Sequence, residues 1–315
     1  MNHLLLALQV VLPLCLWMGW GYLGKKWMSL DEKWTEKINV VVFNMFLPML
    51  LFRNIAESDL KSNLTTNTLW LGICIILGIT LSFVGAMCVV PRFVQDNSRK
   101  SVIAHGIVRS NTSLYALSIA SALYGSENVS IVMLLIGMVI PLYNVLGVLS
   151  FELFRGGKLK WGDILWKIAK NPLIIAVLLG MVFQLFDLRL PVAVRGAVWG
   201  MAECATPISF FVLGASFTFA SATKNSKALI PTVLLRLVFI PLVAVLVAVS
   251  VGVRGVPLAS VLLVFGAPTA VSTYPMACAM GGDPHLSSEI VIFTSLFSIV
   301  SIFIWIAVLK SMALI

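Results

Sequence analysis

Charged residues are scarce in this sequence. Asp, Glu, Lys and Arg together make up 11% of its 315 residues, whereas apolar residues make up 60% and the mean hydropathy is +1.02. Soluble domains carry about 25% charged residues, so too few polar side chains remain here to cover a soluble surface. The composition excludes a soluble protein and indicates an integral membrane protein.

Cysteine is also sparse, and familiar catalytic motifs are missing. The five cysteines lie inside apolar runs with no zinc-binding spacing, so we expect small buried side chains rather than disulfides or a metal site. The sequence has no His-Glu-x-x-His, no Gly-x-Ser-Gly and no pair of membrane aspartates, which are the motifs of intramembrane enzymes. We therefore expect neither an enzyme nor a bound cofactor.

Basic residues exceed acidic ones and give a net charge of +9. They lie in short connections between apolar segments, where they indicate membrane orientation and not a nucleic-acid surface. Fourteen Lys and Arg fall in the odd connections and five in the even ones, which predicts a plasma-membrane protein with both termini outside. The ten predicted spans are 4–24, 37–56, 67–90, 101–124, 129–152, 172–187, 192–220, 228–251, 256–280 and 287–311.

The two halves of the chain carry similar interruptions, which align when Ser118 is placed on Pro275. Each half holds five spans, so the second copy is inverted across the membrane. Paired interruptions in two such repeats point to a transporter's binding site. The predicted units are residues 1–155, a basic amphipathic cytoplasmic linker at 156–171, and residues 172–315.

The fourth span concentrates polar side chains in an otherwise apolar segment. We expect its helix to open near 111–118, so that backbone N–H groups at the start of the next half-helix bind an anion. The alternative is structural: Ser and Thr bond carbonyls of their own helix, and Asn111 bridges helices. The candidate substrate-binding residues in this span are Asn111, Thr112, Ser113, Tyr115 and Ser118.

The ninth span holds two prolines seven residues apart, which remove two backbone donors and disfavour a regular helix. We expect an unwound stretch between them, with a simple proline kink as the alternative. The candidate substrate-binding residues here are Pro268, Thr269, Ser272 and Pro275.

Ionisable residues inside spans are costly, which makes them candidates for function. Arg109 is a candidate for direct contact with an anion or for recruiting anions at the entrance, whereas Arg236 is expected to pair with a carboxylate or a carbonyl. Glu203 and His105 are candidates for proton coupling, with a structural role as the alternative. Two further polar residues near prolines, Asn44 and Asn144, are candidates for lining the same cavity, or they mark ordinary kinks.

Residues 109–125 read RSNTSLYALSIASALYG and resemble the fourth span of the auxin efflux carrier family. Further matches, such as Leu47-Pro48 and Gly282-Asp283, run along nearly the whole chain. The sequence departs from the family at Ser118, where proline is usual, and at Ser110 and Ala116, where glycine is usual.

The resemblance implies an all-α protein of ten transmembrane helices in two inverted repeats, with a fold similar to sodium/proton antiporters and bile acid symporters. Spans one, two, six and seven would form a scaffold. Spans three to five and eight to ten would form a moving transport domain, with broken spans four and nine crossing at the substrate. It also implies a homodimer and a small organic anion as substrate.

We therefore predict a secondary transporter that binds a small carboxylate, such as a dicarboxylate or an auxin-like acid, and moves it by elevator-type alternating access. The co-transported ion, proton or sodium, stays open. The alternatives are an anion channel and a solute-sensing membrane receptor. No nucleic-acid partner is expected.

Overall fold

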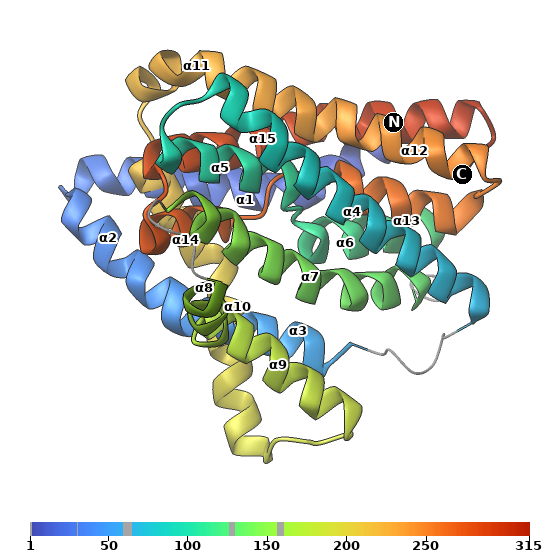
Figure 1. Cartoon of the computed structure of the whole chain (residues 1–315), viewed down its shortest axis with the longest axis horizontal. Helices are drawn as coiled ribbons and strands as arrows, with labels where there is room; N and C mark the ends of the chain where they lie inside the picture. Colours follow the sequence, from blue (N-terminus) through green and yellow to red (C-terminus); the bar gives the residue numbers. More distant parts are fainter. Residues whose placement is uncertain (1, 30, 59–64, 126–129, 156–160) are drawn as a thin grey trace.

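The computed structural model describes residues 2–29, 31–58, 65–125, 130–155 and 161–315, and this part of the chain is helical (Figure 1). Its only extended backbone pairing is one isolated antiparallel bridge. The elements are α1 (Asn2–Trp27), α2 (Glu32–Val41), η1 (Val42–Phe46), α3 (Leu47–Ala56), α4 (Thr66–Phe93), α5 (Asn97–Val108), α6 (Thr112–Tyr124), α7 (Ser130–Phe154), α8 (Trp161–Ala169), α9 (Pro172–Leu185), α10 (Val192–Ser216), α11 (Phe219–Leu234), η3 (Leu235–Phe239), α12 (Ile240–Ser250), α13 (Gly255–Gly266), α14 (Thr273–Met280) and α15 (Pro284–Ser311).

Short polar side chains set where several helices begin. The Asp31 carboxylate accepts the N–H of Trp34 at the start of α2, and Asn171 accepts the N–H of Leu173 at the start of α9. These oxygens satisfy donors that have no partner in the first helical turn. Other helices with such a side-chain cap are α4, α5 and α15, capped by Thr65, Asp96 and Asp283.

Six helical segments in the described residues are long and apolar enough to cross a membrane. The structure is thus that of a multi-pass membrane protein. Helices also lie in the other segments that the sequence predicts as spans. Two of these helices, α9 and α13, are too short to cross a membrane fully. The six segments are 33–56, 66–93, 131–154, 192–216, 219–250 and 284–311.

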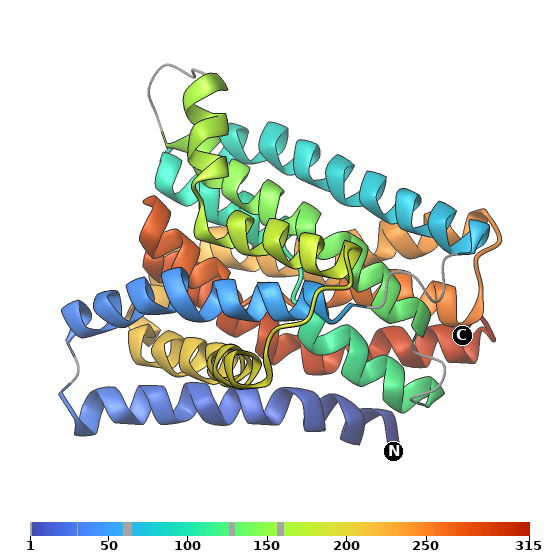
Figure 2. The same cartoon turned by 90° about the horizontal axis from the view of Figure 1, so that it is seen from below.

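The helices form two packed groups that meet along α1 and α15. In the first group α1 packs on α10, and α3 packs on α9 and α10; in the second, α4, α5 and α7 pack together, as do α12 with α13 and α11 with α15. Figure 2 shows α1 and α4 on opposite sides of the molecule. A large cluster of buried aliphatic and aromatic side chains forms the core, and buried polar residues such as Arg236 lie within it.

Two glycines let α1 and α10 approach each other closely. A Cβ at Gly21 would collide with the carbonyl of Phe211, and a Cβ at Gly214 would collide with the carbonyl of Met18. Small residues at helix contacts are the usual means by which membrane helices pack tightly. This contact fixes the first group, against which the second group lies.

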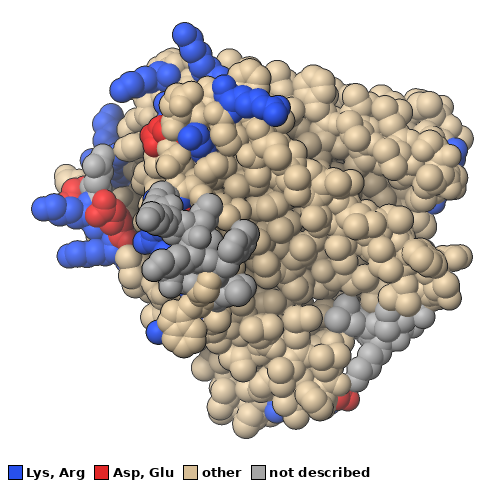
Figure 3. All heavy atoms as spheres, viewed as in Figure 1, with Lys and Arg blue, Asp and Glu red and all other residues tan. Residues whose placement is uncertain are grey.

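The two ends of the bundle differ in charge. Both termini lie at one end in Figure 1, and Lys and Arg side chains gather at the opposite end in Figure 3. We call the latter the basic end; it includes the last turn of α1, the start of α2 and the starts of α5 and α15. The wide surface between the two ends is apolar, as contact with lipid requires.

Candidate functional site

Two helical segments are interrupted, and the backbones of the two interrupted stretches are hydrogen-bonded to each other. The first lies between α5 and α6 at residues 109–111, and the second between α13 and α14 at residues 267–272. The backbone N–H of Asn111 donates to Pro268 O at 2.8 Å, and that of Ala270 donates to Arg109 O at 3.2 Å. This pairing forms the antiparallel bridge between Ser110 and Thr269. It satisfies backbone groups that lipid could not.

The interruptions are shorter than the sequence predicts. The expected opening at 111–118 is wrong in its extent, because α6 is already helical from Thr112 and includes Ser118, whose side chain lies outside what the structure describes. The unwound stretch in the ninth segment ends at Ser272, so Pro275 lies in the first turn of α14. Proline is tolerated there because first-turn N–H groups have no partner within the helix.

Arg236 holds the ends of the two broken helices together. It is 1% exposed and lies in η3, beside the crossing. Its guanidinium donates to Ala267 O at 2.9 and 2.6 Å and to the carbonyls of Ile107 and Val108 at 3.1 and 3.2 Å. The carbonyl alternative predicted for Arg236 is confirmed. The residue neutralises the negative ends of α5 and α13.

Thr269 is also a structural link. Its hydroxyl donates to Gly106 O at 2.7 Å, and its backbone N–H donates to Thr294 Oγ1 at 3.2 Å. The side chain is fully buried and does not line the cavity described next. The predicted substrate-binding residues Pro268 and Thr269 therefore shape the crossing rather than facing an open space.

A cavity of about 240 Å³ lies against the crossing and extends toward the last turn of α3. Residues of the first turn of α6 line this cavity, and such N-terminal turns carry positive partial charge. Among the described residues no acidic side chain lines it. The lining residues are Leu47, Leu50, Leu51, Arg53, Asn54, Arg109, Ser110, Asn111, Thr112, Ser113, Leu114, Ile140, Tyr143, Thr206, Ala270, Val271 and Ser272.

Four polar side chains of this cavity have buried atoms without a hydrogen-bond partner in the described structure. They are Nε of Arg109, Oγ of Ser110, Nδ2 of Asn111 and Oγ of Ser272. Two of these atoms are obligatory donors, and a buried donor left unpaired costs about 1–3 kcal/mol. Such a set is suited to a ligand that supplies hydrogen-bond acceptors.

The side chain of Asn144 orients the guanidinium of Arg109. Its Nη1 donates to Asn144 Oδ1 at 3.0 Å, while Nδ2 of Asn144 donates to Ile140 O at 2.8 Å. Asn144 is fully buried and lies outside the cavity lining. It therefore positions the guanidinium but does not face the open space itself.

The remaining candidates do not line this cavity. Asn44 in η1 is exposed and donates to Val40 O at 2.8 Å, and buried Tyr115 meets Ser298 Oγ at 3.5 Å. His105 is buried and bonds Ser150 Oγ at 3.1 Å. The side chain of Glu203 is 67% exposed and pairs with Arg53 at 3.2 Å.

Sequence reasoning predicted a contribution of the second span through Asn44 but missed the last turn of α3. Arg53 and Asn54 line it but lie more than fifty residues before the crossing, and no local pattern marks them. Arg53 pairs with Glu57 at 3.2 Å, and Arg195 pairs with the same carboxylate at 3.1 Å. Partial burial would raise the pKa of Glu57, but hydrogen bonds from Trp199, Arg195 and Arg53 hold that pKa below its ordinary value.

A helical membrane protein whose two broken segments meet at a polar cavity has the features of a membrane transporter. A family model described as membrane transport protein matches residues 6–306 of the chain. The chain belongs to this family, and the predicted membership of the auxin efflux carriers is confirmed. An uncharacterized transporter of Methanothermobacter thermautotrophicus is 25% identical over 290 residues, which cover 92% of this chain and 94% of that protein.

Proposed function

We propose that the protein is a secondary transporter of a small organic anion, a mono- or dicarboxylate, bound in the cavity at the crossing. The observation that supports this best is the pair of buried donors without partners, Arg109 Nε and Asn111 Nδ2. A carboxylate supplies two acceptor oxygens, and a guanidinium is matched to it in charge and shape.

The electrostatics of the cavity also favour an anion. Two arginines line it, and the described lining has no carboxylate. Arg53 is held by Glu57 and Glu203, whereas within the described residues the neutral amide of Asn144 is the only hydrogen-bond partner of the buried Arg109 side chain. The positive charge of Arg109 is thus left available to a ligand.

Our proposal for the movement follows the two packed groups. Spans one, two, six and seven act as a scaffold, and the crossing helices move with spans three to five and eight to ten as an elevator. The proposed units remain residues 1–155 and 172–315, as inverted repeats, with a linker at 156–171, of which 156–160 lie outside the described residues. The scaffold forms the homodimer, and both termini lie outside the plasma membrane, with the basic end in the cytoplasm.

A thermal-unfolding screen of the purified full chain tests the ligand class. Mono- and dicarboxylates are compared at two pH values, with and without sodium, because a ligand stabilises the folded state by mass action. We expect a saturable rise in Tm with one carboxylate class. No rise with any carboxylate across the panel would contradict an anion site.

Transport into proteoliposomes tests the site with a matched pair of variants. Asn111→Ala removes the unpaired donor and is expected to lower uptake at least tenfold, whereas Asn44→Ala, which bonds only its own helix, keeps wild-type uptake. Equal uptake by both variants would contradict the site. Counterflow exchange of labelled substrate separates a carrier from an anion channel and from a receptor.

A further inference from the structure

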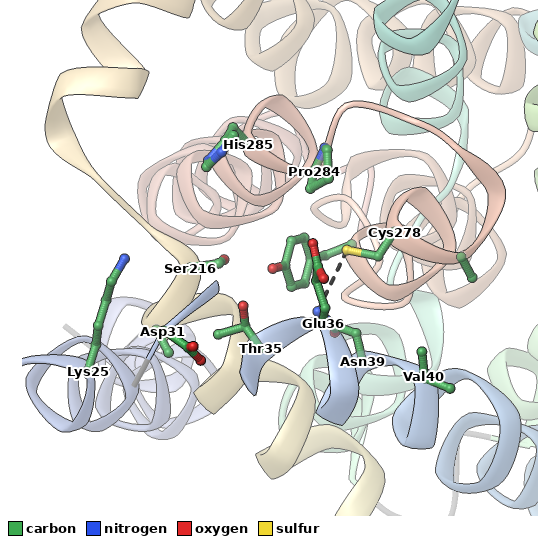
Figure 4. Close-up of a pocket in the computed structure, with 13 residues that line it drawn as sticks. Lys25, Asp31, Thr35, Glu36, Asn39, Val40, Ser216, Cys278, Pro284 and His285 are labelled. Atoms are coloured by element: carbon green, nitrogen blue, oxygen red, sulfur yellow. Dashed lines mark hydrogen bonds between the residues drawn. The ribbon is translucent and has the colours of Figure 1, made fainter. Parts of the chain in front are cut away.

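A second cavity, of about 290 Å³, lies at the basic end and shares no residue with the crossing cavity. The ends of α1 and α10 and the length of α2 as far as Val40 line one side, and α14 and the start of α15 line the other. Figure 4 shows this cavity with α2 below it and His285 and Pro284 above. Neither the sequence nor the proposed transport cycle assigns it a ligand.

Two hydrogen-bond acceptors in this cavity have no donor among the described protein residues: the carboxylate of exposed Glu36 and Oδ1 of buried Asn39. Glu36 and Asn39 lie one helical turn apart on α2, and Figure 4 shows Glu36 reaching from α2 toward Cys278 of α14. The Glu36 carboxylate has no ion pair or hydrogen bond within the described residues. Asn39 is 1% exposed; its Nδ2 donates to Cys278 Sγ at 3.6 Å, but its Oδ1 has no partner.

Acidic and basic side chains both line this cavity. Asp31 is a second carboxylate in the lining, and one of its oxygens accepts the N–H of Trp34 at 2.8 Å. Lys25 and His285 are the basic lining residues. Figure 4 shows Lys25 on the opposite side of the cavity from Glu36. Lys33 and Lys37 flank Glu36 in the sequence of α2.

We propose that this cavity binds a small organic cation, an alkylammonium whose N–H groups donate to Glu36 and Asn39. An ammonium group carries three donors and a full positive charge, which satisfies both acceptors at once. Tyr274 of α14 also lines the cavity, and an aromatic ring is a favourable neighbour for a cation.

Size and ligand set favour an organic cation over a metal ion. One water molecule needs about 10–15 Å³ of cavity volume, so this cavity of about 290 Å³ has room for several non-hydrogen atoms. In the described part of the chain no three His, Cys, Asp or Glu side chains are grouped to hold a metal ion. The bound cation contacts α2 on one side and α14 on the other and so connects these two helices.

Thermal unfolding of the purified full chain tests the proposal with ethylammonium chloride as the probe. Tetramethylammonium and sodium chloride at equal ionic strength are the comparisons, because neither cation carries an N–H donor. We expect a saturable rise in Tm with ethylammonium alone. Absence of that rise, or an equal rise with either comparison salt, overturns the proposal.

A matched pair of variants locates the binding. Glu36→Gln removes the unpaired carboxylate and is expected to weaken the apparent affinity for ethylammonium at least tenfold. Asp187→Asn makes the same change in charge at an exposed turn far from the cavity and is expected to keep wild-type affinity. Equal affinity of the wild type and Glu36→Gln overturns the assignment. These measurements do not involve a carboxylate, so their failure leaves the proposed anion transport standing.

Discussion

Arg236 donates two hydrogen bonds to the carbonyl oxygen of Ala267, one from Nε at 2.9 Å and one from Nη2 at 2.6 Å. Its remaining donor group reaches the carbonyls at the end of α5. One buried side chain thus replaces the hydrogen bonds that two helices lose where they are interrupted. The stability of the crossing depends on a residue from a third segment.

Replacing Arg236 with methionine is expected to destabilise the protein strongly. The substitution keeps an apolar stem but leaves three buried carbonyls without this donor, at about 3 kcal/mol or more in total. Thermal unfolding in detergent measures the loss. Arg254→Met is the control, since Arg254 bonds carbonyls at an exposed helix end and is expected to shift Tm little. Equal Tm values for the two variants would contradict this role.

Thr269→Val is expected to cost about 1–2 kcal/mol of stability, because Gly106 O loses a buried hydroxyl donor. The shape of the side chain is nearly unchanged, so packing is preserved. Thr80→Val is the matched control: its hydroxyl bonds only Ile76 O of its own helix. A Tm of Thr269→Val as high as that of Thr80→Val would show that the bond at the crossing adds nothing.

Gly21→Ala is expected to separate α1 from α10 and to lower Tm clearly. The new Cβ would meet the carbonyl of Phe211, and backbone cannot move aside as a flexible side chain can. Gly19→Ala provides the comparison, since a Cβ there meets nothing within 4 Å. Unfolding midpoints of the two variants, measured side by side, check the prediction; similar midpoints would argue against close packing at Gly21.

The ion pairs around Glu57 are expected to make the stability of the folded protein depend on pH in the acidic pH range. Its folded pKa lies below the ordinary value of 4.5, so the carboxylate stabilises the folded state above pH 4.5. That contribution is lost as pH falls through the lowered pKa. Glu57→Gln should therefore unfold at a lower temperature than the wild type at pH 7, and the difference should shrink below pH 4.5. A difference independent of pH would exclude this cause.

The sequence predicts the two interruptions because their causes are local. Proline at 268 removes a backbone donor, and the polar run beginning at Arg109 is costly in lipid. Both features are readable without knowing any partner. The length of each interruption cannot be predicted from the sequence, because it depends on which carbonyls accept hydrogen bonds across the crossing. Pro268 O, for example, accepts the N–H of Asn111.

The lining of the cavity is only partly predictable for a related reason. Asn111 and Ser272 stand out as polar residues in apolar spans, whereas Arg53 lies at a helix end, where a basic residue is ordinary. Asn44 shows the opposite error: it is polar and near a proline, but its amide bonds its own helix and faces outward. The direction in which a polar side chain points comes from tertiary packing, which one sequence does not reveal.

The bridge between Ser110 and Thr269 limits how any cargo can leave. The two main-chain bonds tie strands from opposite halves of the polypeptide, so neither can slide past the other without breaking both. Release by parting the two segments would cost both of those bonds. A joint displacement of both strands avoids that cost.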